Sequence, residues 1–100
     1  MSKGYWIARL EVTDSEKYDA YRASNAPAFD KYGGHFLVRG GTFEAPEGTS
    51  RTRNVVIEFP SYQAALDCYR SPEYATAKAA RDGGAEMDLI IIEGYDEALS

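Results

Sequence analysis

The strongest constraint on the fold is the order in which strand-like and helix-like segments follow one another along the chain. The strand-like segments mix aromatic and β-branched residues and alternate in part between apolar and polar positions. The helix-like segments repeat their apolar residues three or four positions apart. The strand-like segments are residues 4–12, 35–39, 53–59 and 87–94, and the helix-like segments are residues 13–32, 61–69 and 72–81.

The first helical segment is predicted to contain a break. Thr13 and Glu16 fit a capping box at its start, in which each side chain satisfies a backbone N–H of the first turn. Pro27 lacks an N–H and clashes with the preceding turn, so we expect a kink or a restart near Asn25. A stripe at helical spacing should face the sheet, and it consists of Tyr18, Tyr21, Asn25, Phe29 and Tyr32.

The second helical region is predicted in two pieces. Ser71 is suited to an N-cap, Pro72 to the first helical position and Glu73 to the first turn, so a new helix should begin there. The resulting order is β-α-β-β-α-β. It predicts an α+β, ferredoxin-like fold: a four-stranded antiparallel sheet with two broken helices on one face. One hundred residues suffice for one domain, so residues 1–100 are expected to form a single ferredoxin-like domain.

The sheet face away from the helices does not have the polar pattern of a face that meets water. Leu89 to Ile92 are four consecutive apolar residues, so both faces of the last strand are apolar, and Ile7 and Val56 add to the second face. A second copy of the chain is the simplest cover, which predicts a homodimer through the open sheet face, a dimeric α/β barrel. The alternative is a monomer covered by its own tail or by the hairpin arm at residues 42–51. We favour the dimer because these segments are short and polar.

Composition excludes several functional classes. The net charge of −5 and the pI of about 4.8 argue against a nucleic-acid partner, which needs a basic face. No apolar run approaches the length of a membrane span, and residues 1–5 do not resemble a signal peptide, so no membrane partner and a cytoplasmic location are expected. One cysteine, Cys68, and one histidine, His35, cannot form a disulfide or a His-rich metal site, so no metal and no cofactor are predicted.

Several charged residues occupy positions where they need partners. Arg9, Glu11 and Glu58 are predicted on the second sheet face, with Arg39 and Glu93 nearby. The glycine pair after Arg39 leaves the direction of its side chain open. An arginine could clamp a carboxylate while a glutamate acts as a base. From the pattern alone we favour the other interpretation, salt bridges that fix the register of the dimer.

Polar-tipped residues on the sheet-facing side of the helices could line a cleft between helices and sheet. They are Tyr18, Tyr21, Asn25, Tyr69 and Tyr74. Packing at the edge of the core is the favoured alternative. Cys68 is expected to be a partly buried, inert thiol, and His35 is expected to be exposed at a strand start.

Three motifs together resemble the bacterial family called domain of unknown function 1330. They are KYGGHFLVRGG at residues 31–41 with Glu44, RNVVIEFPS at residues 53–61 and YRSPEY at residues 69–74. The resemblance implies a member of the dimeric α/β-barrel superfamily and no established activity. The family's motif residues fall on Asn25, Gly34, Arg39, Gly40, Glu44, Arg53, Glu58, Ser61, Tyr69, Ser71 and Tyr74.

Two functional hypotheses follow. The first is a dimer that binds a small organic anion between sheet and helices, or a cofactor-free enzyme, isomerase or monooxygenase-like, that acts on a small organic acid. Arg39 and Glu58 would be its polar anchors, and the full candidate set is Tyr21, Asn25, Arg39, Arg53, Glu58, Ser61 and Tyr69. A haem site is not expected, because His35 would have to be the axial ligand. The second hypothesis is a purely structural or stress-accessory dimer whose polar strand residues serve only the interface.

Overall fold

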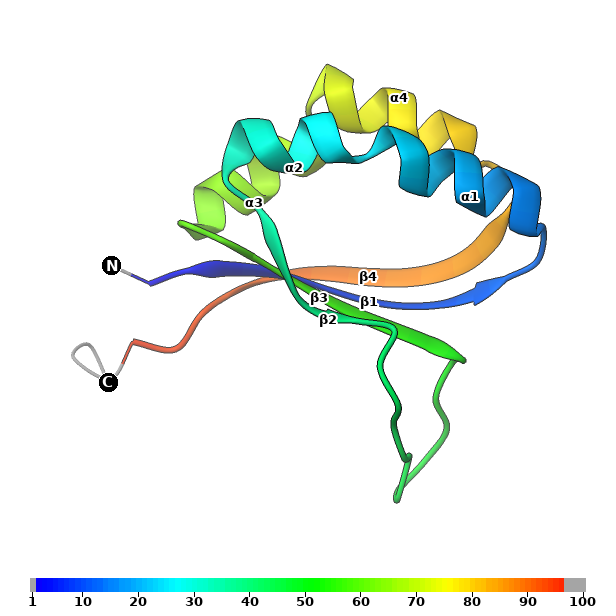
Figure 1. Ribbon diagram of the computed structural model, residues 1–100. Coiled ribbons are helices and arrows are strands. Elements are labelled where there is room, and N and C mark those ends of the chain that lie inside the picture. Colours follow the sequence, from blue (N-terminus) through cyan, green and yellow to red (C-terminus); the bar gives the residue numbers. More distant parts are fainter. Residues whose placement is uncertain (1, 97–100) are drawn as a thin grey trace.

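The computed structural model describes residues 2–96. Four strands and four helices follow one another along the chain (Figure 1). They are β1 (Gly4–Val12), α1 (Ser15–Ser24), α2 (Ala26–Tyr32), β2 (His35–Arg39), β3 (Arg53–Phe59), α3 (Tyr62–Tyr69), α4 (Pro72–Ala80) and β4 (Ala85–Glu93).

The four strands form one antiparallel sheet in the order β2-β3-β1-β4, and the helices all lie on one of its faces (Figure 1). This is the ferredoxin-like α+β arrangement that the order of segments predicts. The bounds of β1, β2 and β3 agree with the sequence prediction. β4 begins at Ala85, two residues before its predicted start, because Ala85 still pairs with Val12.

The core lies between the sheet and the helices. Alternate residues of β1 and β3 point into it, among them Trp6, Leu10 and Phe59, which are almost fully buried. The Trp6 indole packs edge-on against Tyr74 and donates a hydrogen bond of 2.9 Å from Nε1 to the carbonyl of Ala65. A buried indole with its N–H satisfied fixes α3 and α4 against the centre of the sheet.

The predicted break in the first helical segment is present. Asn25 ends α1 and begins α2, and Pro27 lies in the first turn of α2, where its missing N–H costs nothing. The predicted capping box is wrong. Asp14 caps α1 by accepting bonds of 3.1 and 3.3 Å from the N–H groups of Glu16 and Lys17. A carboxylate accepts two such bonds and carries the negative charge that a helix N-terminus favours.

The connection between β2 and β3 is a loop, residues 40–52, with no strand pairing along it. Figure 1 shows this loop projecting from the sheet on the side away from the helices. A turn was predicted near Pro46 to Gly48, and Gly48 has the positive φ of a turn residue, 72°. The predicted hairpin arm at residues 42–51 therefore turns as expected but forms no strands.

The sheet face away from the helices carries exposed apolar side chains, as the run from Leu89 to Ile92 predicts. Ile90 and Ile92 are 54% and 45% exposed. Ile7 pairs with Ile90 on one side and with Val56 on the other, so apolar residues extend across three strands. No helix within residues 2–96 has the length and apolarity needed to cross a bilayer. The same residues hold no group of three or more His, Cys, Asp or Glu side chains placed to bind a metal ion.

Candidate ligand-binding site

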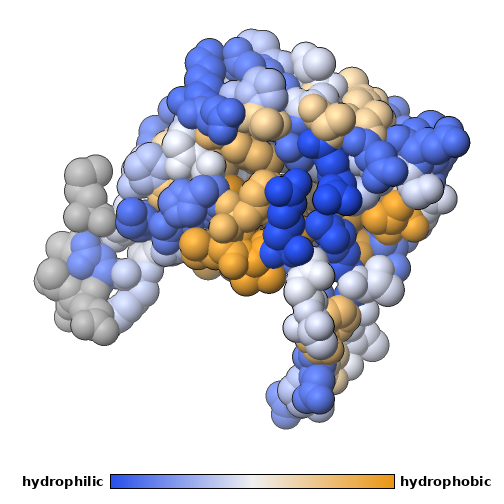
Figure 2. Space-filling view, viewed as in Figure 1, coloured by the Kyte–Doolittle hydropathy of each residue, from blue (hydrophilic) through white to orange (hydrophobic). Residues whose placement is uncertain are grey.

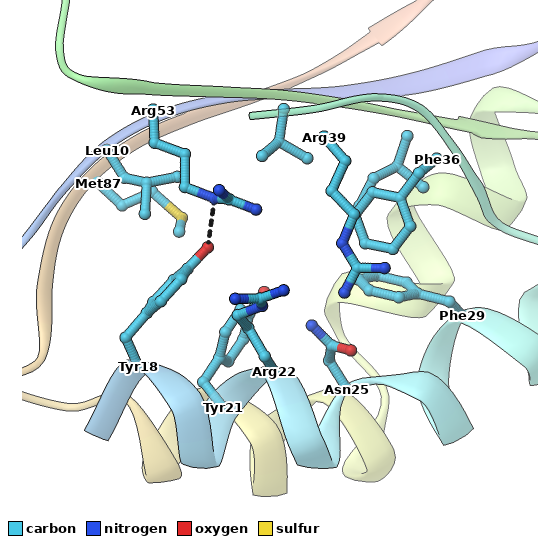
Figure 3. Close-up of a pocket in the computed structure, with 12 residues that line it drawn as sticks. Leu10, Tyr18, Tyr21, Arg22, Asn25, Phe29, Phe36, Arg39, Arg53 and Met87 are labelled. Carbon is cyan, nitrogen blue, oxygen red and sulfur yellow. Dashed lines mark hydrogen bonds between the residues drawn. The ribbon is translucent and has the colours of Figure 1, made fainter. Parts of the chain in front are cut away.

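A pocket opens between the sheet and helices α1 and α2 (Figure 3). It holds about 360 Å³ of empty space, part of which is open to solvent at its mouth. Its lining residues come from both layers of the fold and are Leu10, Tyr18, Tyr21, Arg22, Asn25, Phe29, Phe36, Arg39, Arg53, Val55, Ile57 and Met87. The cavity itself is only about 30 Å³, so a ligand larger than one or two water molecules must also occupy the open mouth or displace lining side chains.

Three arginines meet at this pocket. Arg39 is the last residue of β2, Arg53 is the first residue of β3, and Arg22 lies in the last turn of α1. Figure 3 shows Arg39 and Arg53 extending from the sheet, with Arg22 opposite them on the helix side. None of the three forms an ion pair with a carboxylate in the described part of the chain. Their positive charge is therefore not neutralised by the pocket itself.

A β-bulge directs Arg39 into the pocket. Phe36 pairs with Ile57, but Val38 pairs with Val56 and Arg39 with Val55, so Leu37 is an extra residue in the β2 strand. The extra residue places Arg39 on the same face as Phe36, towards the helices. Its guanidinium carbon lies 4.1 Å from the centre of the Phe36 ring, a cation–π contact that supports the side chain.

Two contacts position Arg53. Its Nε donates a hydrogen bond of 3.0 Å to the Tyr18 hydroxyl, which links β3 to α1 across the pocket (Figure 3). Gly40 adjoins the guanidinium so closely that a Cβ atom there would collide with it, and Gly40 has a φ of 69°. Glycine is the residue that accepts both the positive φ and the close approach.

The helix side of the pocket contains Tyr21 and Asn25, both at least nine-tenths buried. The Tyr21 hydroxyl lies 3.0 Å from the hydroxyl of Tyr74, and Arg81 Nη2 donates a bond of 3.3 Å to that same Tyr74 oxygen. Burial raises the pKa of Tyr21 far above its usual value, and the neighbouring Tyr74 raises it further. Tyr21 is therefore a neutral hydrogen-bonding group at every physiological pH.

Glu58 is not part of this pocket. It lies on the open sheet face, where its carboxylate accepts a bond of 3.0 Å from the Tyr5 hydroxyl and lies 3.2 Å from His35 Nε2 and 3.9 Å from Lys3 Nζ. The bond to Glu58 raises the pKa of Tyr5. Arg39 and Glu58 therefore lie on opposite faces of the sheet and cannot anchor one small ligand in this pocket, so that pairing is wrong.

Ser61 and Tyr69 also lie away from the lining of the pocket. Ser61 is the N-cap of α3 and accepts a bond of 3.0 Å from the N–H of Ala64. Tyr69 packs its ring against Trp6 and Tyr74, and Lys78 Nζ lies over the ring at 5.2 Å from its centre. Of the seven predicted site residues, the structure brings four together at the pocket: Tyr21, Asn25, Arg39 and Arg53.

The remaining charged candidates also lie outside the pocket, and two of them form hydrogen bonds to neighbouring residues. Arg9 donates to Asn54 Oδ1 at 3.2 Å, and Glu11 accepts bonds from the backbone and the hydroxyl of Thr52. Glu93 pairs with Gly4 in the register, so it does not belong with Glu11 on the open face.

The structure also shows the surroundings of Cys68 and His35, the two residues with potentially reactive side chains. Cys68 is fully rather than partly buried, and burial raises its pKa to about 12, which makes the thiol inert. His35 is exposed at the start of β2, as predicted.

Sequence reasoning did not single out Arg22. The signal was present, because residues 18, 22 and 25 follow helical spacing along α1 and its C-cap. An exposed arginine in a last helical turn is ordinarily explained by the helix dipole, so the spacing alone did not distinguish it. Figure 2 shows strongly hydrophilic side chains directly beside hydrophobic ones above the projecting loop. The pocket lining has the same mixture, arginines beside apolar side chains.

Solved structures share this fold at low sequence identity. A protein of unknown function from Rhodopseudomonas palustris is 20% identical with a TM-score of 0.75, covering 95% of this chain and 84% of its own. SnoaB, a cofactor-independent oxygenase from Streptomyces nogalater, is 12% identical with a TM-score of 0.62 and full coverage of both chains. A dimeric protein of unknown function with a ferredoxin-like fold from Bacteroides fragilis is 17% identical with a TM-score of 0.54, covering 91% of this chain and 95% of its own.

No curated protein matches this chain. The family resemblance carried by the three sequence motifs is confirmed, because the sequence model of one family matches residues 3–95. The chain belongs to the family described as domain of unknown function (DUF1330).

Proposed function

We propose that this protein binds a small organic anion in the pocket between the sheet and helices α1 and α2, with the carboxylate of the ligand held between Arg39 and Arg53. One observation carries the proposal: Arg22, Arg39 and Arg53 converge on an apolar-walled hollow and form no ion pair within residues 2–96. Arginine presents several donors in a planar fork that matches a carboxylate.

The pocket walls add a second requirement. Leu10, Val55, Ile57 and Met87 supply aliphatic surface from the sheet, while Phe29 and Phe36 supply aromatic surface. A ligand that contacts both the arginines and these walls has an anionic head and an apolar body. Fully hydrated anions without an apolar part, such as phosphate, gain nothing from such walls.

We also propose that the protein acts as a homodimer through the open sheet face. The exposed Ile90 and Ile92, flanked by Ile7 and Val56, support this assembly because an apolar sheet face gains free energy when a second copy covers it. A likeness in fold to a dimeric protein with a ferredoxin-like fold is consistent with the proposal. If the protein were instead a structural or stress-accessory dimer, the pocket arginines would bind no ligand.

Cofactor-free catalysis on the same organic acid is the second candidate. The fold that the chain shares with SnoaB, a cofactor-independent oxygenase, favours it. Among residues 2–96 the pocket lining contains no carboxylate and no imidazole, so a general base from this part of the chain would have to be a tyrosine, or the ligand itself would have to supply it. Binding is therefore the function that the geometry supports best.

A thermal-shift experiment tests the proposal. Pentanoate and phenylacetate are compared with the corresponding neutral amides, on wild type and on the variants Arg39→Gln and Arg53→Gln. We expect the carboxylates, but not the amides, to raise the Tm of wild type, and we expect either substitution to remove most of that shift. Arg70→Gln, at an exposed position outside the pocket, is the matched control and should behave as wild type. A wild-type protein that no carboxylate stabilises more than its amide would contradict the proposal.

A further inference from the structure

A chain of three hydrogen-bonding groups leads from α4 to the pocket. Arg81 Nη2 lies 3.3 Å from the Tyr74 hydroxyl oxygen, and the Tyr74 hydroxyl lies 3.0 Å from that of Tyr21. A guanidinium has donors and no acceptor, so the Tyr74 oxygen accepts the bond from Arg81. The direction of the first step is therefore fixed by chemistry.

In the second step either hydroxyl can be the donor, and the two environments differ. Tyr74 is fully buried among aromatic rings, including those of Trp6, Phe29 and Tyr69. Its hydroxyl proton needs an acceptor, because an unpaired buried donor is costly, and the acceptor within reach is the Tyr21 oxygen. Donation from Tyr74 to Tyr21 satisfies this proton, and it leaves the proton of Tyr21, which lines the pocket, to find its acceptor there.

When Tyr74 is the donor, the proton of Tyr21 has no acceptor among the described residues. In this arrangement the Tyr21 oxygen accepts from Tyr74. Tyr21 also lines the pocket. Figure 3 shows Tyr21 on the helix side of the pocket, opposite the sheet-borne Arg39 and Arg53.

Arg81 is placed to orient this chain rather than to pair with an acid. It is half-buried, its Nε is buried with no hydrogen-bond partner, and its guanidinium carbon lies 5.1 Å from the centre of the Tyr21 ring. It forms no ion pair with any carboxylate in the described part of the chain. A cation kept in this setting polarises the two phenols in one direction.

We infer that the ligand is an organic acid with a second oxygen acceptor, an oxo group, and that Tyr21 donates a hydrogen bond to this oxygen while Arg81 acts through Tyr74 as a positioning residue. The inference rests on the proposed function for the carboxylate, which Arg39 and Arg53 hold on the sheet side of the pocket. The two ends of the ligand are thus recognised from opposite walls.

Matched acids test the inference by isothermal titration calorimetry. Pentanoate, 2-oxopentanoate and 4-oxopentanoate carry the same charge and a similar carbon chain, but pentanoate lacks the oxo group. We expect at least one oxo acid to bind wild type about fivefold more tightly than pentanoate, the effect of one neutral hydrogen bond. Tyr21→Phe should abolish this preference, so that pentanoate and the oxo acids bind the variant with similar affinities.

Variants at Arg81 test the positioning role. Arg81→Met should remove the preference for the oxo acid, and Arg81→Lys, which retains a charged donor, should restore part of it. Circular dichroism confirms that each variant is folded. A preference that survives in Arg81→Met while Tyr21→Phe abolishes it would overturn the role of Arg81.

The two proposals fail in different ways. If no acid binds wild type, the proposed function fails. If pentanoate and both oxo acids bind wild type equally, or if the preference persists in Tyr21→Phe, the inference about Tyr21 is overturned and the carboxylate site stands.

Discussion

The Nε atom of Arg53 donates a hydrogen bond of 3.0 Å to the Tyr18 hydroxyl, joining the first residue of β3 to the first helix across the mouth of the pocket. The same contact holds the guanidinium carbon 5.8 Å from the centre of the Tyr18 ring. Tyr18 thereby fixes one end of the arginine and leaves its terminal nitrogens available to a ligand.

Replacing Tyr18 with Phe should lower both stability and ligand affinity. The substitution removes the acceptor for Arg53 Nε and keeps the ring in the core, so the free energy of unfolding should fall by about 1 kcal/mol. Urea denaturation measures this loss. Tyr62→Phe is the control, because the exposed Tyr62 makes no side-chain hydrogen bond within residues 2–96. Equal stability of Tyr18→Phe and wild type would contradict the structural role given to this bond.

Gly40→Ala should destabilise the protein and weaken carboxylate binding together. Alanine at a φ of 69° is strained, and its Cβ would displace the Arg53 guanidinium, at a cost of about 1–2 kcal/mol in unfolding free energy. Gly41→Ala is a closely matched control, since a Cβ at Gly41 meets no atom within 4 Å and its φ is not positive. Denaturation and a carboxylate titration of both variants check the prediction, and similar behaviour of the two would refute it.

These positions also show how far the sequence determines the site. The order of the segments and the alternation within β1 and β3 predict the sheet and its two faces, because side-chain direction along a regular strand has a period of two residues. The stripe of Tyr18, Tyr21 and Asn25 was predictable for the same reason, from helical spacing.

The direction of Arg39 was not predictable from the pattern. One extra residue in β2 moves the side chains that follow it to the opposite sheet face. The sequence pattern does not indicate whether that extra residue lies before or after Arg39. The position of the bulge places Arg39 and Glu58 on opposite sheet faces, and it therefore decides which residues share a pocket. The cap of α1 was similarly ambiguous, because Thr13 and Asp14 are adjacent residues of types that both favour the N-cap.

The stability of the protein should fall at alkaline pH through Cys68. Burial raises the pKa of its thiol to about 12 in the folded protein, from about 9.0 for an unperturbed thiol. Above pH 9 the unfolded chain loses this proton while the folded chain keeps it, so unfolding becomes more favourable up to pH 12, by at most about 1.4 kcal/mol per pH unit.

Denaturation between pH 8 and pH 11 measures this effect on wild type and on Cys68→Ala. The variant lacks the thiol, so its stability should decline less steeply with pH, whatever its absolute stability. Parallel declines in the two proteins would show that Cys68 does not contribute. A thiol reagent should also react with native wild type only as fast as the protein opens.

The open sheet face predicts the effect of a charge on assembly. Ile90→Lys places a charge on the apolar face and should convert the proposed homodimer into a monomer of 11.1 kDa, as measured by light scattering at micromolar concentration. Tyr62→Lys introduces the same charge at an exposed apolar residue of α3 and should leave the dimer intact. A wild-type mass of 11.1 kDa would rule out the dimer at that concentration.

The location of the bound anion tests the account most directly. An NMR titration of ¹⁵N-labelled protein with phenylacetate follows the backbone amides of both sheet faces in one experiment. The account predicts saturable shifts concentrated at Tyr18, Asn25, Phe36, Arg39 and Arg53, absent from the Arg39→Gln, Arg53→Gln double variant. Shifts centred on Glu58 and Ile90 of the open face, or no saturable shifts at all, would contradict it.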